Sequence, residues 1–239
     1  MDFNSFKEEM NINLKNLNID LTEEQLNSFY KYMNLLIEKN KVMNLTGITD
    51  PKDIVLKHFI DSLTVLKYVQ DGSFLIDVGT GAGFPGLPLK IANASIEVTL
   101  LDSLNKRINF LNEVVNENNL GNITTIHGRA EDFGQNQKYR ENFDVVVSRA
   151  VAPLNILLEY MLPFVKMGGK CICMKGSNCE EEIENAKKAI KVLGGEIEKI
   201  EEFTLPNSDN NRTILIIKKV KKTDRQYPRK AGIPTKNPI

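Results

Sequence analysis

The fold of this chain is best predicted from one short segment, in which an apolar strand containing an acid runs into a glycine-rich turn and then a helix. Phe74–Val78 is the expected strand, and Pro85 suits the first turn of the helix that follows. Glycine adopts positive φ and carries no Cβ, so the backbone amides of such a turn can approach a bound ligand. An ordinary tight turn is the alternative, but it rarely needs so many glycines beside an acid. The segment therefore predicts a nucleotide-like ligand, with candidate binding residues Asp77, Gly79, Gly81 and Gly83.

A second strand with an acid at its end follows downstream. Ile96–Asp102 is apolar and β-branched, and Asp102 lies roughly 20 residues beyond the glycines. In doubly wound folds a carboxylate at this place accepts hydrogen bonds from the two hydroxyls of a ribose. The alternative is that Asp102 only caps a helix that begins at Ser103, and the two roles are compatible. Together the two strands predict a cofactor that contains adenosine.

Strands and helices alternate from residue 74 to about residue 220, which is typical of a parallel sheet with crossover helices. Further strands are expected at 123–127, 143–148, 170–175, 196–200 and 212–217, with helices at about 103–118, 153–166 and 179–193. The last two strands are separated only by the turn-rich segment 206–211, so they should form an antiparallel hairpin. This predicts an α/β fold of the Rossmann-like class I methyltransferase type, with a seven-stranded, mostly parallel sheet.

The first 70 residues are expected to form a helical extension packed on the sheet. One helix should begin after Thr22, which forms a capping box with Gln25, and its apolar stripe is expected to be core rather than a groove for a partner. A second helix should open at Pro51. It carries His58 and Asp61, which are three residues apart and whose role, structural or functional, stays open.

The composition suits one α/β domain with an appendage. The chain has 239 residues, of which 41% are hydrophobic and 26% charged. We expect a helical extension at 1–70, a Rossmann-like domain at 71–220 and a basic tail at 221–239. From residue 218 onward there are eight basic residues and one acid, so this end is net +7 and the rest is net −7. Such asymmetry predicts contact with a polyanion.

The compartment is expected to be the cytoplasm. Three cysteines are too few and wrongly spaced for a structural zinc site, and an odd number does not suit a disulfide framework. The amino terminus is charged and lacks a sustained apolar run, so neither a signal peptide nor a membrane anchor is expected. With only two histidines and no Cys-x-x-Cys, no metal site is expected either.

The fourth strand suggests which chemistry the site performs. No Tyr-x-x-x-Lys pair is present, which argues against a short-chain dehydrogenase. The segment Ser148–Pro153 contains neither Asn/Asp-Pro-Pro-Tyr nor a cysteine nucleophile, as amine and cytosine-C5 methyltransferases would need. An acceptor with a free lone pair, such as guanine N7, needs only to be aligned with a sulfonium methyl group. Arg149, at the end of this strand, suits a carboxylate or phosphate, or else forms a structural ion pair.

The motifs closely resemble those of the RsmG family, also called glucose-inhibited division protein B. The resemblance spans nearly the whole chain and rests on residues 77–86, 101–103, 128–131, 148–150, 174–176 and 227–234. It implies methylation of guanine N7 at position 527 of 16S ribosomal RNA, with S-adenosylmethionine as methyl donor. It also implies that the cofactor contacts Gly79, Phe84, Ala130, Glu131 and Arg149. Glu131 could otherwise be a solvated loop acid.

The basic residues then become candidates for RNA contact. Lysine and arginine neutralise phosphates, and an aromatic ring can stack on a base. The candidates are Lys175, Arg212, Arg225, Tyr227, Arg229 and Lys230. Two alternatives stay open: a non-catalytic RNA-binding or ribosome assembly protein that keeps the fold, and a methyltransferase for a small molecule. We expect a monomer that acts on the small ribosomal subunit and does not contact a membrane.

Overall fold

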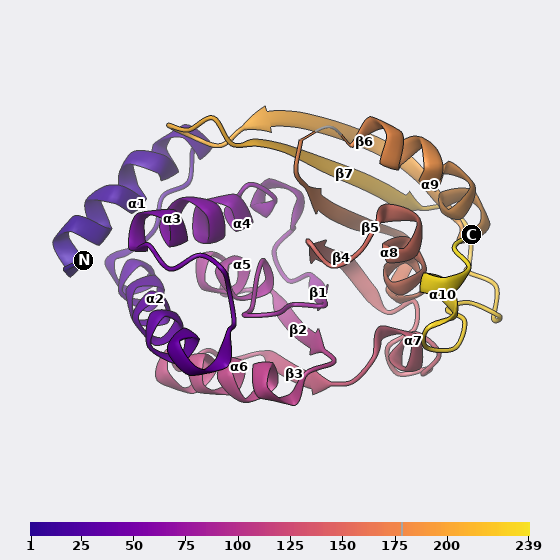
Figure 1. Ribbon diagram of the computed structural model, residues 1–239, viewed down its shortest axis with the longest axis horizontal. Coiled ribbons are helices and arrows are strands. Elements are labelled where there is room, and N and C mark those ends of the chain that lie inside the picture. Colours follow the sequence, from indigo (N-terminus) through magenta and orange to yellow (C-terminus); the bar gives the residue numbers. More distant parts are fainter. Residues whose placement is uncertain (178) are drawn as a thin grey trace.

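The computed structural model describes residues 1–177 and 179–239, and within them the chain forms a seven-stranded sheet with helices on both faces (Figure 1). The strands lie in the order β3-β2-β1-β4-β5-β7-β6. Their bounds are β1 Phe74–Val78, β2 Glu97–Asp102, β3 Ile123–His127, β4 Phe143–Arg149, β5 Val165–Lys175, β6 Gly195–Thr204 and β7 Asn211–Lys219. The first five pair in parallel, and β7 lies antiparallel between β5 and β6, so the predicted hairpin is confirmed.

This strand order determines where a ligand can bind. The chain runs outward from β1 through β2 to β3, then returns to place β4 on the other side of β1. Crossover connections therefore leave in opposite directions from β1 and β4, which opens a crevice beyond their carboxyl ends. The glycine-rich turn follows β1, and Arg149 ends β4, so both lie at this crevice.

Two hydrophobic cores hold the layers together. One packs the amino-terminal helices with α5 and α6 against one face of the sheet, and the other packs α8 and α9 against the opposite face. The helices are α1 Phe3–Leu17, α2 Glu23–Met43, α3 Pro51–Ile54, α4 Asp61–Leu63, α5 Gly86–Ala92, α6 Asn105–Glu117, α7 Ala130–Phe133, α8 Leu154–Met161, α9 Glu180–Val192 and α10 Ile233–Lys236. The amino-terminal extension is thus a layer of the molecule, because its apolar faces supply much of the first core.

The extension begins its helices where the sequence predicts. Thr22 and Gln25 form the expected capping box at the start of α2, and the apolar stripe of that helix is buried core. Asp50 caps α3, which starts at Pro51. Between α3 and α4 the residues Val55–Ile60 are π-helical, which no sequence pattern had indicated. Single π-helical turns often mark functional sites because they shift the register of the side chains that follow.

Two helix boundaries differ from expectation. The helix expected at 153–166 ends at Met161, and a short 3-10 turn, Leu162–Phe164, leads directly into β5. Pro163 lacks an amide hydrogen and cannot continue an α-helix, so the strand starts five residues earlier than predicted. Pro85 also lies just before α5, which begins at Gly86, and not in its first turn.

The basic tail is packed on the protein. Arg140 donates hydrogen bonds to the backbone carbonyls of Thr223, Asp224 and Tyr227. Arg229 forms an ion pair with Glu159 of α8, whose side chain is completely buried. The tail and α10 therefore lie against α7 and α8, as the yellow segment in Figure 1 shows.

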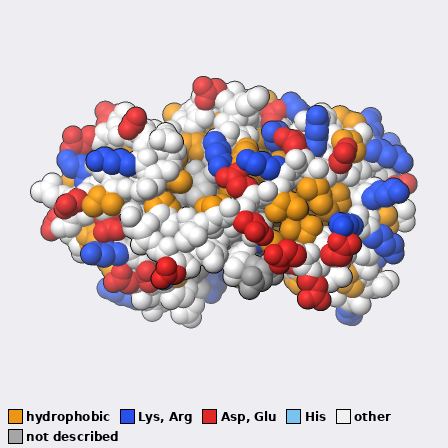
Figure 2. Space-filling view, turned by 90° about the horizontal axis from the view of Figure 1, so that it is seen from above, with side chains coloured by type: hydrophobic (Ala, Val, Ile, Leu, Met, Phe, Trp, Pro, Cys, Tyr) orange, Lys and Arg blue, Asp and Glu red, His pale blue; other side chains and the backbone are white. Residues whose placement is uncertain are grey.

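Charges on the sheet edge are mixed. Strand β6 is one of the two outer strands, and its exposed positions include both lysine and glutamate. Seen from above, acidic and basic side chains are interspersed, and both border an apolar patch right of centre (Figure 2). Charged edge strands resist pairing with another chain. Among the described helices, none is both long and apolar enough to span a membrane.

Candidate functional site

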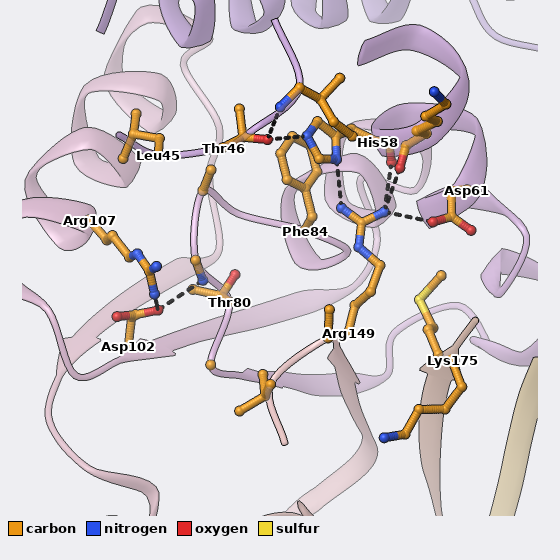
Figure 3. A pocket seen from close by; sticks show the side chains of 18 of the residues that line it. Leu45, Thr46, His58, Asp61, Thr80, Phe84, Asp102, Arg107, Arg149 and Lys175 are labelled. Carbon is orange, nitrogen blue, oxygen red and sulfur yellow. Dashed lines mark hydrogen bonds and ion pairs between the residues drawn. The ribbon is translucent and has the colours of Figure 1, made fainter. Parts of the chain in front are cut away.

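A cavity of about 620 Å³ lies at the carboxyl ends of β1, β4 and β5, beneath the loop that joins α2 to α3. The close-up in Figure 3 shows that its walls come from distant parts of the sequence. The glycine-rich turn and Asp102 line one side, and His58, Asp61 and Arg149 the other. Its lining contains five lysines or arginines and two acids, so the cavity has a net positive charge. The cations are Lys57, Arg107, Arg149, Lys175 and Arg212.

The glycine-rich turn is shaped mainly by bonds within the protein. Gly79, Gly81 and Gly83 all have positive φ, as the sequence predicts. Their amides donate to Leu101 O, to the Asp102 carboxylate and to Thr80 O, respectively. These three amides are thus engaged within the protein, and contact between the turn and a ligand stays a prediction. The glycines instead let the turn fold back on the ends of β1 and β2, so that Gly79 and Gly81 present backbone surface to the cavity.

Asp77 lies beneath the turn and outside the cavity lining. It is completely buried, and its Oδ2 accepts hydrogen bonds from the Thr80 hydroxyl and the Gly86 amide. Burial raises the pKa of this carboxyl to about 6, although both hydrogen bonds lower it. Gly83 is likewise absent from the lining. Both residues thus shape the turn rather than reach the cavity.

Asp102 lies at the junction between the main cavity and a smaller one of about 160 Å³. Its carboxylate accepts hydrogen bonds from the amides of Gly81 and Leu104 and from Arg107. The helix α6 begins at Asn105, its N-cap is Leu104, and no side chain caps it, so the alternative that Asp102 caps this helix is wrong. The bond from the Leu104 amide instead holds the loop that leads into the helix. Ala130 and Glu131, which the resemblance assigns to the cofactor, line the smaller cavity next to the residue predicted to bind ribose.

Val151 lies between the two cavities and lines both. A Cβ added at Gly79 would lie 2.7 Å from Val151 Cγ2. Only glycine fits at position 79 without moving this side chain. The two cavities also share Gly79, Asp102 and Ser103 in their linings, so they are adjacent.

Arg149 is the centre of a polar cluster on the opposite wall. Its guanidinium donates to Asp61 Oδ2 at 3.0 Å and to His58 Nδ1 at 3.0 Å, and it lies over the ring of Phe84. Asp61 Oδ1 also accepts from Arg212 Nε at 3.1 Å. Asp61 therefore bridges two arginines, and the structural ion pair considered for Arg149 is present.

His58 is held neutral in this cluster. Its ring stacks on Phe84 at 4.4 Å between centroids, inclined by 12°. Burial and the charge of Arg149 lower the pKa of His58 to about 3. His58 and Asp61 contact Arg149 rather than each other, which the spacing along one helix could not indicate. The π-helical turn between α3 and α4 places both side chains toward the cavity.

Lys175 and Arg212, predicted to contact RNA, lie inside the main cavity. Lys175 donates to Ala152 O and pairs with Glu182 Oε1 at 2.6 Å, and its side chain is 12% exposed. Lys175 and Arg212 therefore belong to the wall of the cavity, where each has an acidic partner, and not to an exposed basic surface.

Comparison with known proteins identifies the family. The profile described as rRNA small subunit methyltransferase G, also named GidB, matches residues 25–215. The chain belongs to this family. It is 56% identical to Ribosomal RNA small subunit methyltransferase G of Alkaliphilus oremlandii, with 93% of this chain and 94% of the relative covered. The protein of the same description from Desulforamulus reducens is 55% identical, with 94% and 95% covered. The predicted resemblance is confirmed.

Solved structures confirm the fold. The chain superposes on a SAM-dependent methyltransferase from Aquifex aeolicus with a TM-score of 0.55 and 18% identity, covering 73% of this chain and 96% of the other. It also matches M. jannaschii TYW2 in complex with AdoMet, with a TM-score of 0.53, 16% identity, and 67% and 74% covered. The class I methyltransferase fold with an amino-terminal helical extension is thus the fold of this family member.

In this rRNA small subunit methyltransferase G family member, the tail residues predicted to contact RNA fall into two groups. Arg225 and Lys230 are exposed. Tyr227 is half-buried against the second core, and Arg229 donates from its backbone amide, Nε and NH2 to Glu159. Arg229 is thus paired with a buried acid and its side chain is 23% exposed, and its contact with RNA stays a prediction.

Proposed function

We propose that this protein transfers a methyl group from S-adenosylmethionine to N7 of a guanine in 16S ribosomal RNA, at position 527. The observation that carries this function is the two-part cavity at the switch point of the sheet, where the glycine turn meets Asp102, in a chain of the rRNA small subunit methyltransferase G family. Ligands of open α/β sheets bind at this place.

The cofactor would span the two adjacent cavities. Asp102 would hold the ribose, with Ala130 and Glu131 beside the adenine and Gly79 beside the methionine portion. Arg107 has a side chain that is 32% exposed, so a ribose can replace its bond to Asp102 without uncovering a buried cation. Phe84 and Arg149 line the remaining part of the main cavity. S-Adenosylmethionine supplies the methyl group as part of a sulfonium cation.

The wall residues suit a reaction that needs positioning and no proton transfer. Guanine N7 carries a free lone pair, so no base has to remove a proton before attack. His58 is buried and neutral, with both ring nitrogens engaged, and is therefore not available as a general base. Arg149 and Arg212 are fixed by Asp61, which keeps their positive charge in place at the cavity. Fixed dipoles and charges of this kind stabilise a reacting group without reorganising.

The charge of the cavity supports RNA as the acceptor. Five cations and two acids line it, and the exposed tail residues Arg225 and Lys230 add positive charge near α7 and α8. Phosphate neutralisation by such cations gives binding that weakens steeply with salt. We infer that the partner is the small ribosomal subunit in the cytoplasm, bound by one copy of the chain.

The proposed function is tested by mapping modified nucleosides in 16S ribosomal RNA from cells with and without this protein. Loss of 7-methylguanosine at one site, restored by supplying the protein, would support it. Unchanged modification would refute it. If the protein only binds RNA without catalysis, its loss would leave the modification unchanged but alter subunit assembly. If it methylates a small molecule, its loss would change neither the modification nor the assembly.

A further inference from the structure

Thr46 is a polar residue of the main cavity that the reaction as described does not use. It lies in the loop between α2 and α3, above the polar cluster (Figure 3). Asn40 fixes its backbone from both sides: the Thr46 amide donates to Asn40 Oδ1 at 2.9 Å, and Asn40 Nδ2 donates to Thr46 O at 2.8 Å. The backbone from which the Thr46 side chain extends is therefore held in place.

The direction of each hydrogen bond at His58 is set by Arg149. A guanidinium has only donors, so His58 Nδ1, 3.0 Å from Arg149 NH2, must accept. A neutral imidazole carries its hydrogen on the other nitrogen when one accepts. The low pKa of His58, caused by burial and by the charge of Arg149, agrees with this neutral form. His58 Nε2 therefore donates to Thr46 Oγ1, which is 2.8 Å away.

The Thr46 hydroxyl then has one hydrogen left to donate. A hydroxyl has two acceptor lone pairs and one donor hydrogen. One lone pair accepts from His58 Nε2, and the other accepts from the Ile48 amide at 3.0 Å. Among the described residues, the structure records no acceptor for the hydroxyl hydrogen. Both lone pairs are used within the protein, so the hydrogen is free to point into the cavity.

We propose that the Thr46 hydroxyl donates a hydrogen bond to an anionic oxygen of the ligand, as a residue that positions it. The acceptor is anionic because, in the described part of the chain, Asp61 alone pairs with both Arg149 and Arg212, so one positive charge at this wall of the cavity has no acid of its own. Two sources share this chemistry: the carboxylate of S-adenosylmethionine and a phosphate of the RNA. The inference rests on the proposed function, because that function supplies both oxygens. Arg149 fixes which nitrogen of His58 carries the hydrogen, and His58 in turn leaves the Thr46 hydroxyl as a donor toward the ligand.

The first test compares Thr46→Val with Thr46→Ser and the control Thr49→Val. Thr49 lies in the same loop but is exposed and outside the cavity lining. Valine keeps the shape of threonine and removes the hydroxyl, whereas serine keeps the hydroxyl. A hydrogen bond to a charged group is worth about 1.5–3 kcal/mol, so Thr46→Val should weaken binding of the ligand that holds the oxygen by roughly 10- to 150-fold.

The measurements are calorimetric binding of S-adenosylmethionine and steady-state methylation of small subunits. Weaker cofactor binding would identify the carboxylate, and unchanged cofactor binding with a raised KM for RNA would identify the phosphate. Thr46→Ser and Thr49→Val should resemble the wild type. If Thr46→Val changes neither quantity by more than about twofold, well below the tenfold step of 1.4 kcal/mol, the proposal is wrong. A wild type that binds no cofactor and methylates no RNA would instead refute the proposed function.

A second test is independent of activity. The chain has two histidines, His58 and His127, so ¹⁵N-histidine NMR of the wild type and of a His127→Gln variant assigns the ring signals of His58. The geometry requires the form with hydrogen on Nε2 at neutral pH, and Thr46→Val should shift the Nε2 signal. If the hydrogen is on Nδ1, His58 Nε2 would accept from the Thr46 hydroxyl, which would then have no hydrogen for a ligand. This result would overturn the proposal independently of the activity measurements.

Discussion

Asp61→Asn is expected to destabilise the protein by about 3 kcal/mol, because Asp61 is the shared partner of two arginines. Its carboxylate is 3.0 Å from Arg149 NH1 and 3.1 Å from Arg212 Nε, and its side chain is 5% exposed. Breaking a buried ion pair costs about 3–5 kcal/mol, since the remaining charge stays buried without a partner. Arg212 is partly exposed, at 22%, so the lower end of this range applies. An asparagine amide can accept from one guanidinium, but its NH₂ group would face the donors of the other.

The assay is urea unfolding of both proteins, supported by thermal melting. For a chain of this length 1 kcal/mol corresponds to about 2–4 °C, so the melting temperature should fall by about 6–12 °C. Asp53→Asn is the matched control: it removes a carboxylate that is 45% exposed and pairs with Lys57 one helical turn away. Exposed pairs of this kind contribute less than about 1 kcal/mol. The reasoning fails if Asp61→Asn and Asp53→Asn lower the free energy of unfolding equally.

Three further changes test other parts of the structure. Glu159→Gln should release the tail from α8, because Glu159 is completely buried and binds Arg229 through several bonds. Limited proteolysis should then cut the carboxyl end faster than in the wild type. An unchanged digestion rate would contradict this role of Glu159. His58 has a pKa of about 3 in the folded state and 6.5 in the unfolded state. The contribution of neutral His58 to the free energy of unfolding is therefore complete above pH 6.5. It is lost as the pH falls toward 3, by about 1.4 kcal/mol per pH unit. The difference in unfolding free energy between wild type and His58→Asn should therefore shrink from pH 7 to pH 5, and a constant difference would contradict the assignment. Gly79→Ala should weaken cofactor binding more than Gly81→Ala. Both glycines have positive φ, but only a Cβ at position 79 would contact Val151. Equal losses of cofactor affinity would show that contact with Val151 does not matter.

Local sequence patterns were sufficient to predict the fold and one wall of the cavity, formed by the glycine turn and Asp102. Strands, the capping box and the terminal hairpin depend on residues near one another in the chain, and the structure confirms them. The glycine turn and Asp102 were predictable for the same reason, because each follows a strand whose carboxyl end must lie at the same edge of the sheet. The assignment of the individual site residues to a cofactor stays a prediction.

The polar cluster could not be predicted, because its members come from three distant segments. Asp61 lies 88 residues from Arg149 and 151 residues from Arg212, and no periodic pattern connects such positions. A π-helical turn, which has no clear sequence signal, directs His58 and Asp61 into the cavity. Thr46 was missed because a loop threonine is usually only a solvated polar residue.

The tail shows how composition can mislead. Its surplus of basic residues was counted correctly, but a count does not reveal which charges have partners. Arg229 is neutralised by Glu159, 70 residues earlier in the chain, and serves to hold the tail. Arg225 and Lys230 remain as the exposed candidates for RNA contact.

The most direct measurement is methyl transfer by the purified protein from S-adenosylmethionine labelled in its methyl group to small ribosomal subunits that lack the modification. Nucleoside analysis should find the label in 7-methylguanosine at one guanine of 16S ribosomal RNA, and Asp102→Ala should greatly reduce the amount. Label in a different nucleoside, or no label above that of a reaction without enzyme, would contradict the account.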